Sequence, residues 1–165
     1  MLFSTFIHYS KQTLHMQGKK APQFTLPDQK GKKHALKDYL GQKVLLYFYP
    51  KDLTPGCTIE AQNFRDNLKQ LEKYHVQVLG VSCDTVDMHD KFACKHDLNF
   101  PLLADVEKKV VEKYGVWTEK SMYGKKYMGI QRDSFLIDEK GKILKHYVKV
   151  NPQKHVTEVL KDLMS

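Results

Sequence analysis

The sequence has 165 residues and a formal net charge of +8, and 41% of its residues are apolar. These values predict a globular domain that buries a hydrophobic core, and they exclude an intrinsically disordered chain. No run of 18 apolar residues occurs, which excludes a transmembrane helix, so we expect no membrane partner.

The N-terminal residues 1–16 contain one lysine, no acidic residue and only a short apolar stretch. An organelle-targeting peptide usually has more arginine, and a signal peptide needs a longer apolar core. We therefore interpret this segment as a disordered extension or a start-site artefact, with organelle targeting as the alternative. Residues 17–165 are expected to form one domain.

The first predicted elements of this domain are short. Residues 23–26 predict a strand that ends at Pro27, and residues 35–40 predict one helical turn. Residues 43–49 are a continuous apolar and aromatic run, which is typical of a strand buried on both faces of a sheet. Pro50 ends this strand.

The rest of the chain alternates helix patterns and strand patterns. Apolar residues recur at helical spacing from Cys57 to about Tyr74, which predicts a helix over this range. Asp84 is predicted to cap a later helix, with Asp87 at the capping-box position. This order predicts an α/β fold, a thioredoxin-like three-layer sandwich with a mixed central sheet. The other predicted segments are strands at 76–82, 102–103, 134–137 and 143–150 and helices at 84–96, 106–114 and 156–164.

The chain has three cysteines, Cys57, Cys83 and Cys94. Three are too few for a secreted disulfide scaffold, and no CxxC or CxxxH pair predicts a zinc site. We therefore expect no metal and no cofactor. A cytoplasmic protein with one or two chemically active thiols fits this pattern.

The 27 lysine and arginine residues raise the question of a nucleic-acid partner. They are scattered, and acidic residues lie among them throughout the chain beyond residue 27. We therefore interpret them as a solvated surface and expect no nucleic-acid binding, which stays as a less favoured alternative.

Cys57 stands where a buried strand gives way to a helix. In the first turn of a helix, free backbone N–H groups and the positive end of the helix dipole favour the thiolate, which is the nucleophile. Pro55 and Gly56 predict a tight turn that lets a ligand reach the sulfur, and the Thr54 hydroxyl can bond an oxygen compound. The pattern predicts a small polar substrate attacked by sulfur. The alternative is an inert cysteine packed at a helix start.

The stretch at residues 47–61, YFYPKDLTPGCTIEA, resembles the active-site segment of the peroxiredoxins. It is similar in particular to the branch of bacterioferritin comigratory protein, or peroxiredoxin Q. The resemblance covers about residues 19–164 and implies an antioxidant thiol peroxidase. It continues in order through residues 21–26, 81–84, 100–105, 114–117, 122–130 and 132–138.

The resemblance implies roles for individual residues. Cys57 matches the peroxidatic cysteine, whose thiolate attacks the O–O bond of a hydroperoxide and becomes a sulfenic acid. Thr54 matches the hydroxyl that bonds the peroxide, Pro50 the residue that shields the thiolate from water, and Arg132 the guanidinium that holds the thiolate and polarises the peroxide. A permanent cation and fixed donors suit these roles. Glu60 stands where the family has an acid, although a helix-surface position explains it equally well.

Recycling of a sulfenic acid usually requires a second thiol, which forms a disulfide with it. Many members of this branch have that resolving cysteine five residues after the peroxidatic one, where this chain has Gln62. Another subgroup has it in the next helix, near Cys94, and helical spacing predicts a mostly polar setting for Cys94. Cys83 ends a buried strand at the same sheet edge as Cys57 and is the less favoured candidate. The alternatives are an incidental surface thiol at Cys94 and the absence of any internal resolving thiol.

The resemblance therefore implies thioredoxin-dependent reduction of hydrogen peroxide and small alkyl hydroperoxides by a monomer. One alternative is a one-cysteine peroxidase that an external thiol reduces directly. The other is a redox-relay sensor that passes its oxidation to a partner protein.

Overall fold

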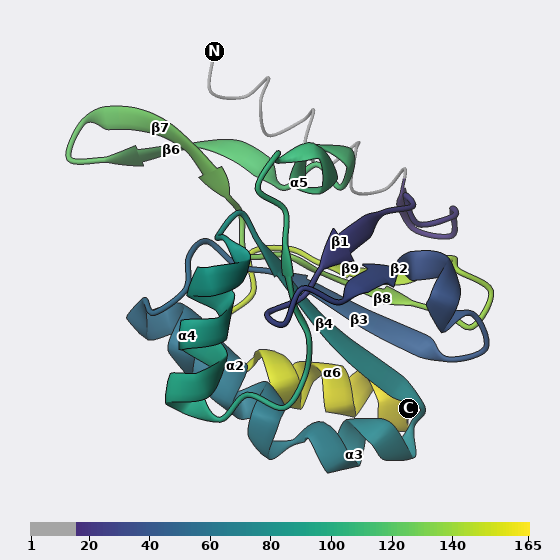
Figure 1. The fold of residues 1–165 in the computed structure, drawn as a ribbon. Helices are drawn as coiled ribbons and strands as arrows, with labels where there is room; N and C mark the ends of the chain where they lie inside the picture. The colour runs from purple at the N-terminus through teal and green to yellow at the C-terminus, as the bar shows by residue number, and fades with distance from the viewer. Residues whose placement is uncertain (1–15) are drawn as a thin grey trace.

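The computed structural model describes residues 16–165, shown as a ribbon in Figure 1. The predicted N-terminal extension lies outside this range apart from Met16, which is partly buried against the core. No helix within residues 16–165 is long and apolar enough to cross a membrane. The elements in chain order are β1 (Thr25–Pro27), β2 (Lys33–Ala35), the 3-10 helix η1 (Leu36–Tyr39), β3 (Lys43–Phe48), α2 (Pro55–Asp66), α3 (Leu68–Lys73), β4 (Val76–Ser82), α4 (Val86–His96), β5 (Leu102–Ala104), α5 (Lys109–Lys113), β6 (Trp117–Met122), β7 (Lys125–Ile130), β8 (Ser134–Ile137), β9 (Ile143–Tyr147) and α6 (His155–Met164).

A five-stranded mixed sheet forms the centre of the domain, with the strand order β5-β4-β3-β8-β9. β3 pairs in parallel with β4, where Leu45 lies opposite Val78, and antiparallel with β8, where Leu45 lies opposite Leu136. β4 pairs in parallel with β5, and β8 pairs antiparallel with β9. The predicted α/β fold with a mixed central sheet is therefore confirmed.

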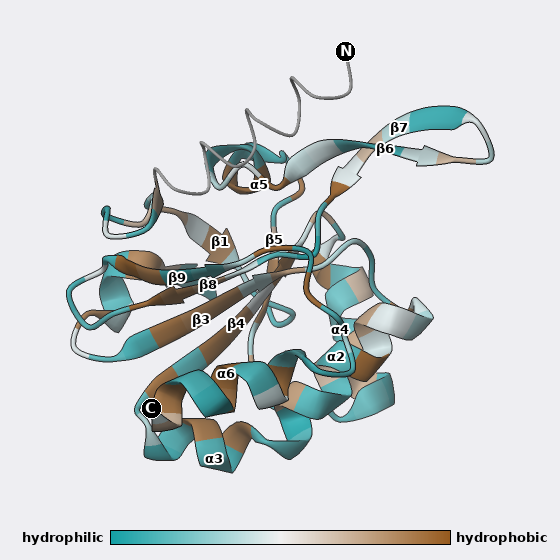
Figure 2. Ribbon diagram, turned by 180° about the vertical axis from the view of Figure 1, so that it is seen from behind, coloured by the Kyte–Doolittle hydropathy of each residue, from teal (hydrophilic) through white to brown (hydrophobic). Residues whose placement is uncertain are grey.

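Both faces of this sheet are covered, which explains the uninterrupted apolar run of β3. Leu45 and Tyr47 pack with residues of α2, α3, α4 and α6, whereas Leu46 and Phe48 pack with residues of η1 and α5 on the opposite face. Figure 2 shows the apolar colouring of β3 and the helices α2, α3 and α6 on one side of the sheet. Each fully buried large apolar side chain contributes about 1.5–3 kcal/mol relative to an exposed one.

The helix predicted from Cys57 to about Tyr74 is two helices, α2 and α3, which are separated at Asn67. The Asn67 side chain donates a hydrogen bond to the Asn63 carbonyl at 2.8 Å, and the Asn67 backbone leaves helical geometry with φ −108° and ψ 10°. Asparagine side chains that bond a carbonyl one turn earlier compete with the helical hydrogen bonds. The helix that contains Cys57 therefore ends after 12 residues.

The N-terminal cap of α4 also differs from the prediction. Thr85 is the N-cap, and its hydroxyl accepts a hydrogen bond from the Met88 N–H at 3.2 Å. Asp84 instead accepts hydrogen bonds from the Asp52 N–H at 2.9 Å and from the Ser82 hydroxyl at 2.6 Å. The Asp84 carboxylate therefore connects two loops and does not start the helix.

The sequence patterns did not predict β2 or the hairpin of β6 and β7, which projects from the domain in Figure 1. Tyr123 and Gly124 form the hairpin turn, and both have positive φ, 50° and 75°, as a two-residue turn of this kind requires. The strands are largely exposed, so they lack the alternating apolar pattern that marks a half-buried strand. Two predicted elements are shorter in the structure, since α5 begins at Lys109 and β9 ends at Tyr147.

Candidate active site

Cys57 is the third residue of α2 and lies in its first turn, shortly after the end of β3. Thr54 is the N-cap, and Pro55 occupies the first helical position, where its missing N–H costs no hydrogen bond. First-turn N–H groups have no partner within the helix and present positive charge, which favours a thiolate. The residue is nonetheless almost fully buried, with 2% of Cys57 exposed.

The guanidinium of Arg132 lies against the Cys57 sulfur. Arg132 comes from the segment between β7 and β8, and its Nη2 donates a hydrogen bond to Cys57 Sγ at 3.4 Å. Its Nη1 donates to Glu60 Oε1 at 2.9 Å, so one guanidinium connects the thiol with a buried carboxylate. Gly56 permits this approach, because a Cβ at that position would lie 3.2 Å from Nη2. The structure thus brings Cys57 and Arg132 together.

Glu60 is fully buried in α2, so its interpretation as a helix-surface residue is wrong. Its Oε1 accepts the hydrogen bond from Arg132, while Oε2 has no partner among the described residues. Burial raises the pKa of Glu60 to about 7, against the opposing effect of the Arg132 charge. This carboxyl group therefore fixes the guanidinium and titrates close to neutral pH.

Glu60→Gln should change how the free energy of unfolding depends on pH. The pKa of Glu60 is about 7 in the folded protein and 4.5 for an ordinary glutamate, so the folded state holds the proton more tightly than the unfolded chain. Wild type should therefore lose roughly 1–3 kcal/mol of stability from this group as the pH rises through that window, and the glutamine variant should not. Urea unfolding from about pH 5 to about pH 8 measures this difference. Equal pH slopes for the two proteins would contradict it.

Thr54 and Pro50 lie in the segment that leads from β3 into the first turn of α2. The Thr54 hydroxyl donates a hydrogen bond to the Lys51 carbonyl at 2.7 Å, and the Thr54 carbonyl accepts one from the Thr58 N–H at 2.9 Å. Pro50 follows the fully buried end of β3 and is itself half-buried. The Thr54 hydroxyl is therefore bonded to its own loop in this structure.

The other two cysteines lie apart from this arrangement, and all three thiols are free. Cys83 is half-buried and packs on the opposite face of the sheet from Cys57, and burial raises its pKa to about 12. Cys94 is exposed on α4, with its sulfur 3.7 Å from a carboxylate oxygen of Asp90 on the same helix. Neither thiol is bonded to Cys57 in this structure.

Sequence reasoning gave no role to two further residues near the thiol. Lys120 of β6 is half-buried, and its pKa is lowered by burial and by the neighbouring Arg132 charge. Tyr47 of β3 is fully buried, and burial together with the nearby Glu60 carboxylate raises its pKa well above the usual range. Gly80 makes room for Tyr47, because a Cβ there would lie 2.9 Å from the tyrosine hydroxyl. No local pattern marks Lys120, since only the fold of the hairpin brings it to the site.

Asp52, Asp84 and His89 offer ligand atoms that lie within 4.8 Å of one another, as a metal site would require. These groups already have protein partners. Asp52 Oδ1 accepts a hydrogen bond from the Tyr49 hydroxyl at 2.6 Å, and Asp52 Oδ2 lies 2.6 Å from His89 Nδ1. His89 Nε2 lies 3.0 Å from the Leu103 carbonyl oxygen. We therefore describe the group as a buried hydrogen-bond network.

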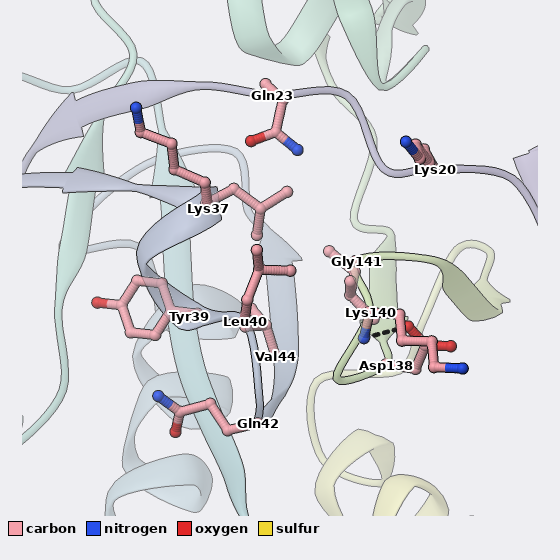
Figure 3. Close-up of a pocket in the computed structure, with 12 residues that line it drawn as sticks. Lys20, Gln23, Lys37, Tyr39, Leu40, Gln42, Val44, Asp138, Lys140 and Gly141 are labelled. Carbon is pink, nitrogen blue, oxygen red and sulfur yellow. Dashed lines mark hydrogen bonds between the residues drawn. The ribbon is translucent and has the colours of Figure 1, made fainter.

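A pocket of about 330 Å³ lies away from the thiol, between η1 and the turn that joins β8 to β9 (Figure 3). Leu36, Val44 and Ile137 are among the apolar residues that line it. Val44 is at the start of β3, whereas Cys57 follows the end of that strand. The pocket is therefore at the opposite end of the sheet and is not part of this site.

A buried cysteine in a first helical turn, held by a guanidinium at the end of a mixed-sheet strand, defines a thiol-dependent oxidoreductase. The chain belongs to the AhpC/TSA family, whose model matches residues 17–146. It is 52% identical over 143 residues to a putative peroxiredoxin bcp of Coxiella burnetii, covering 87% of this chain and 95% of that one. It is 46% identical over 146 residues to the peroxiredoxin Bcp of Bacillus subtilis, covering 88% and 93%.

Solved structures give the same result. A PrxQ mutant of Xylella fastidiosa superposes with a TM-score of 0.83 at 35% identity, covering 88% of this chain and 95% of that one. The bacterioferritin comigratory protein of Xanthomonas campestris gives a TM-score of 0.81 at 36% identity, covering 86% and 90%. The predicted thioredoxin-like fold and the Bcp or PrxQ branch are therefore confirmed. The protein is a peroxiredoxin, a thiol peroxidase that acts on a hydroperoxide and requires a thiol reductant.

Proposed function

We propose that this peroxiredoxin reduces hydrogen peroxide and small alkyl hydroperoxides at Cys57. The observation that carries the proposal is the hydrogen bond of 3.4 Å from Arg132 Nη2 to a cysteine sulfur that is buried in the first turn of α2. A permanent cation beside a helix N-terminus stabilises a thiolate. The related Xanthomonas campestris protein is described as having alkyl peroxide reduction activity, which supports the alkyl substrates.

The chemical step is a two-electron transfer from sulfur to the O–O bond. The Cys57 thiolate attacks one peroxide oxygen, the O–O bond breaks, Cys57 becomes a sulfenic acid, and the other oxygen leaves as water or an alcohol after it takes up a proton. Arg132 polarises the peroxide and stabilises the charge that moves onto the leaving oxygen. The Thr54 hydroxyl gives up its hydrogen bond to the Lys51 carbonyl and bonds a peroxide oxygen instead. Pro50 shields the sulfur from water.

We propose that Cys94 then resolves the sulfenic acid. Its thiol attacks the Cys57 sulfur, water leaves, and the resulting disulfide is reduced by two thiols of thioredoxin. Its exposure on α4 supports this role, because a resolving thiol must be accessible. Cys83 is less suited, since its raised pKa keeps it protonated. Direct reduction of Cys57 by an external thiol and relay of the oxidation to another protein are the alternatives.

Cys94→Ser should separate the two half-reactions. The first turnover with peroxide should keep its wild-type rate, whereas steady-state turnover with thioredoxin should fall to a small fraction of wild type. Stopped-flow measurement of peroxide consumption and peptide mapping of the oxidised protein test this. Mapping that finds Cys57 oxidised to sulfenic or sulfinic acid with Cys94 free would favour the one-cysteine mechanism.

We also propose that the protein is a cytoplasmic monomer that binds no nucleic acid. Ion pairs on its surface support the last point, because they occupy lysines that a phosphate backbone would otherwise contact. Such pairs join Lys30 to Asp90, Lys43 to Glu139 and Lys145 to Asp162.

A further inference from the structure

A fully buried pair connects the active-site loop to the helix that contains Cys94. Asp52 lies in the loop between β3 and α2, His89 lies in α4, and the side chains of both have 0% exposure. Asp52 Oδ2 and His89 Nδ1 are 2.6 Å apart. The Asp52–His89 contact thus joins the loop before α2 to helix α4 inside the core.

The two ring nitrogens of His89 show how this pair is protonated. Nε2 faces the Leu103 carbonyl oxygen, which only accepts, so Nε2 bears a proton. The contact between Nδ1 and Asp52 Oδ2 then requires one more proton between these two atoms. The pair is therefore neutral as a whole and fully hydrogen-bonded, which is the condition for stable burial of such groups.

Asp52 also fixes the loop that leads to the peroxidatic helix. Its N–H donates to Asp84 at 2.9 Å, and its Oδ1 accepts from the Tyr49 hydroxyl at 2.6 Å. The next residue, Leu53, has a φ of 64°, an uncommon backbone conformation for a branched residue. Thr54 follows as the N-cap of α2. Movement of Asp52 would therefore disturb the first turn of α2.

The first turn of α2, helix α4 or both must move if Cys94 is to bond to Cys57. Cys94 is exposed, and the hollow that it lines includes residues of α4 and of the turn after β1, but not the buried Cys57. The far end of α4 is held to α2, because Arg65 Nη1 donates to the His96 carbonyl at 2.6 Å. The Asp52–His89 contact holds the near end.

We propose that the Asp52–His89 pair is a tether that keeps α4 docked against the active-site loop and thereby limits the rate at which Cys94 reaches Cys57. Asp52 and His89 are positioning residues, since neither touches the reacting sulfur. The consequence for the rate rests on the proposed resolving role of Cys94. The step that the tether limits is the attack of the Cys94 thiol on the Cys57 sulfenic acid, which forms the S–S bond and releases water.

Two variants and a control test the tether. His89→Leu removes the hydrogen bonds of the ring to Asp52 and to the Leu103 carbonyl, and its longer contact of 3.4 Å with the Tyr49 hydroxyl. Asp52→Asn retains these contacts, because its amide NH₂ can donate to His89 Nδ1 while its oxygen accepts from Tyr49. The control is His34→Leu, which removes another buried histidine paired with an aspartate, Asp28, at 2.7 Å; the ring partners of His34, Asp28 and Tyr39, are not on α4. If His89→Leu does not fold, His89→Gln takes its place, because its amide can replace the Nε2 donor to the Leu103 carbonyl but not the Nδ1 contact with Asp52.

Hydrogen exchange of the reduced proteins and single-turnover disulfide formation are the two measurements. Relative to wild type, we expect α4 amides to exchange at least about tenfold faster in His89→Leu and disulfide formation to accelerate by roughly threefold to tenfold. We expect Asp52→Asn to stay within about twofold of wild type and His34→Leu to leave α4 exchange unchanged.

Equal exchange rates of the α4 amides in His89→Leu and His34→Leu would overturn the tether. Exchange of the α4 amides in Asp52→Asn as fast as in His89→Leu would overturn it as well. Unchanged disulfide formation despite faster exchange would overturn its effect on the rate. The absence of a Cys57–Cys94 disulfide in oxidised wild type overturns a different statement, the resolving role of Cys94. The exchange measurement, which uses reduced protein, decides the tether in that case as well.

Discussion

Cys57→Ser is expected to reduce peroxide consumption to the uncatalysed background. The serine hydroxyl is close in size to the thiol, but it does not ionise near neutral pH and is a poor nucleophile towards an O–O bond. Helix geometry and the Arg132 contact give the Cys57 sulfur the setting of a nucleophile. Consumption of hydrogen peroxide in the presence of thioredoxin and its reductase measures the loss.

Cys83→Ser is the matched control for that variant. It removes a thiol from the end of the neighbouring strand, on the opposite face of the sheet from Cys57, where burial keeps the pKa at about 12. Most of the activity should therefore remain. Substantial peroxide consumption by Cys57→Ser, with circular dichroism showing both variants folded, would refute the assignment of Cys57.

Arg132→Met is expected to slow the reaction of the reduced protein with peroxide by roughly 10²–10³-fold, the usual effect of removing one fixed donor from a transition state. Methionine keeps much of the apolar stem but removes the cation and both of its contacts, to the Cys57 sulfur and to Glu60. Alkylation of Cys57 should also become fast only at a higher pH than in wild type, because the thiolate loses a neighbouring positive charge. Stopped-flow kinetics and iodoacetamide labelling measure these two effects.

Arg132→Lys separates charge from geometry. Lysine retains a positive charge but lacks the planar fork that reaches sulfur and carboxylate at once. Its alkylation profile should lie between those of wild type and Arg132→Met, while its peroxide rate should remain well below wild type. If Arg132→Met alkylates with an unchanged pH profile, the guanidinium does not stabilise the thiolate.

The amino-acid sequence alone was sufficient to predict the central strands, the alternation of helices and strands around them, and the position of Cys57 at a helix start. These features depend on neighbours in the chain. The apolar run of β3 and the helical spacing after Cys57 are both read within a few residues, and Thr54, Pro55 and Gly56 define the turn locally. A local hydrogen bond also explains why the single helix predicted from Cys57 to about Tyr74 was wrong. The Asn67 side chain bonds to the Asn63 carbonyl and thereby ends α2.

The resemblance implied that Arg132 meets the thiol, and only the tertiary structure showed how it reaches the sulfur and which other distant groups join it. Arg132 is 75 residues from Cys57 and 72 from Glu60 along the chain, and the burial of Glu60, its shifted pKa and the approach past Gly56 exist only once β8 lies beside β3. The pairing of Asp52 with His89, 37 residues away, depends in the same way on α4 packing against the loop. Hydrogen bonds and burial between such residues leave no periodic pattern in the sequence, because they depend on how the elements pack and not on the order of their residues.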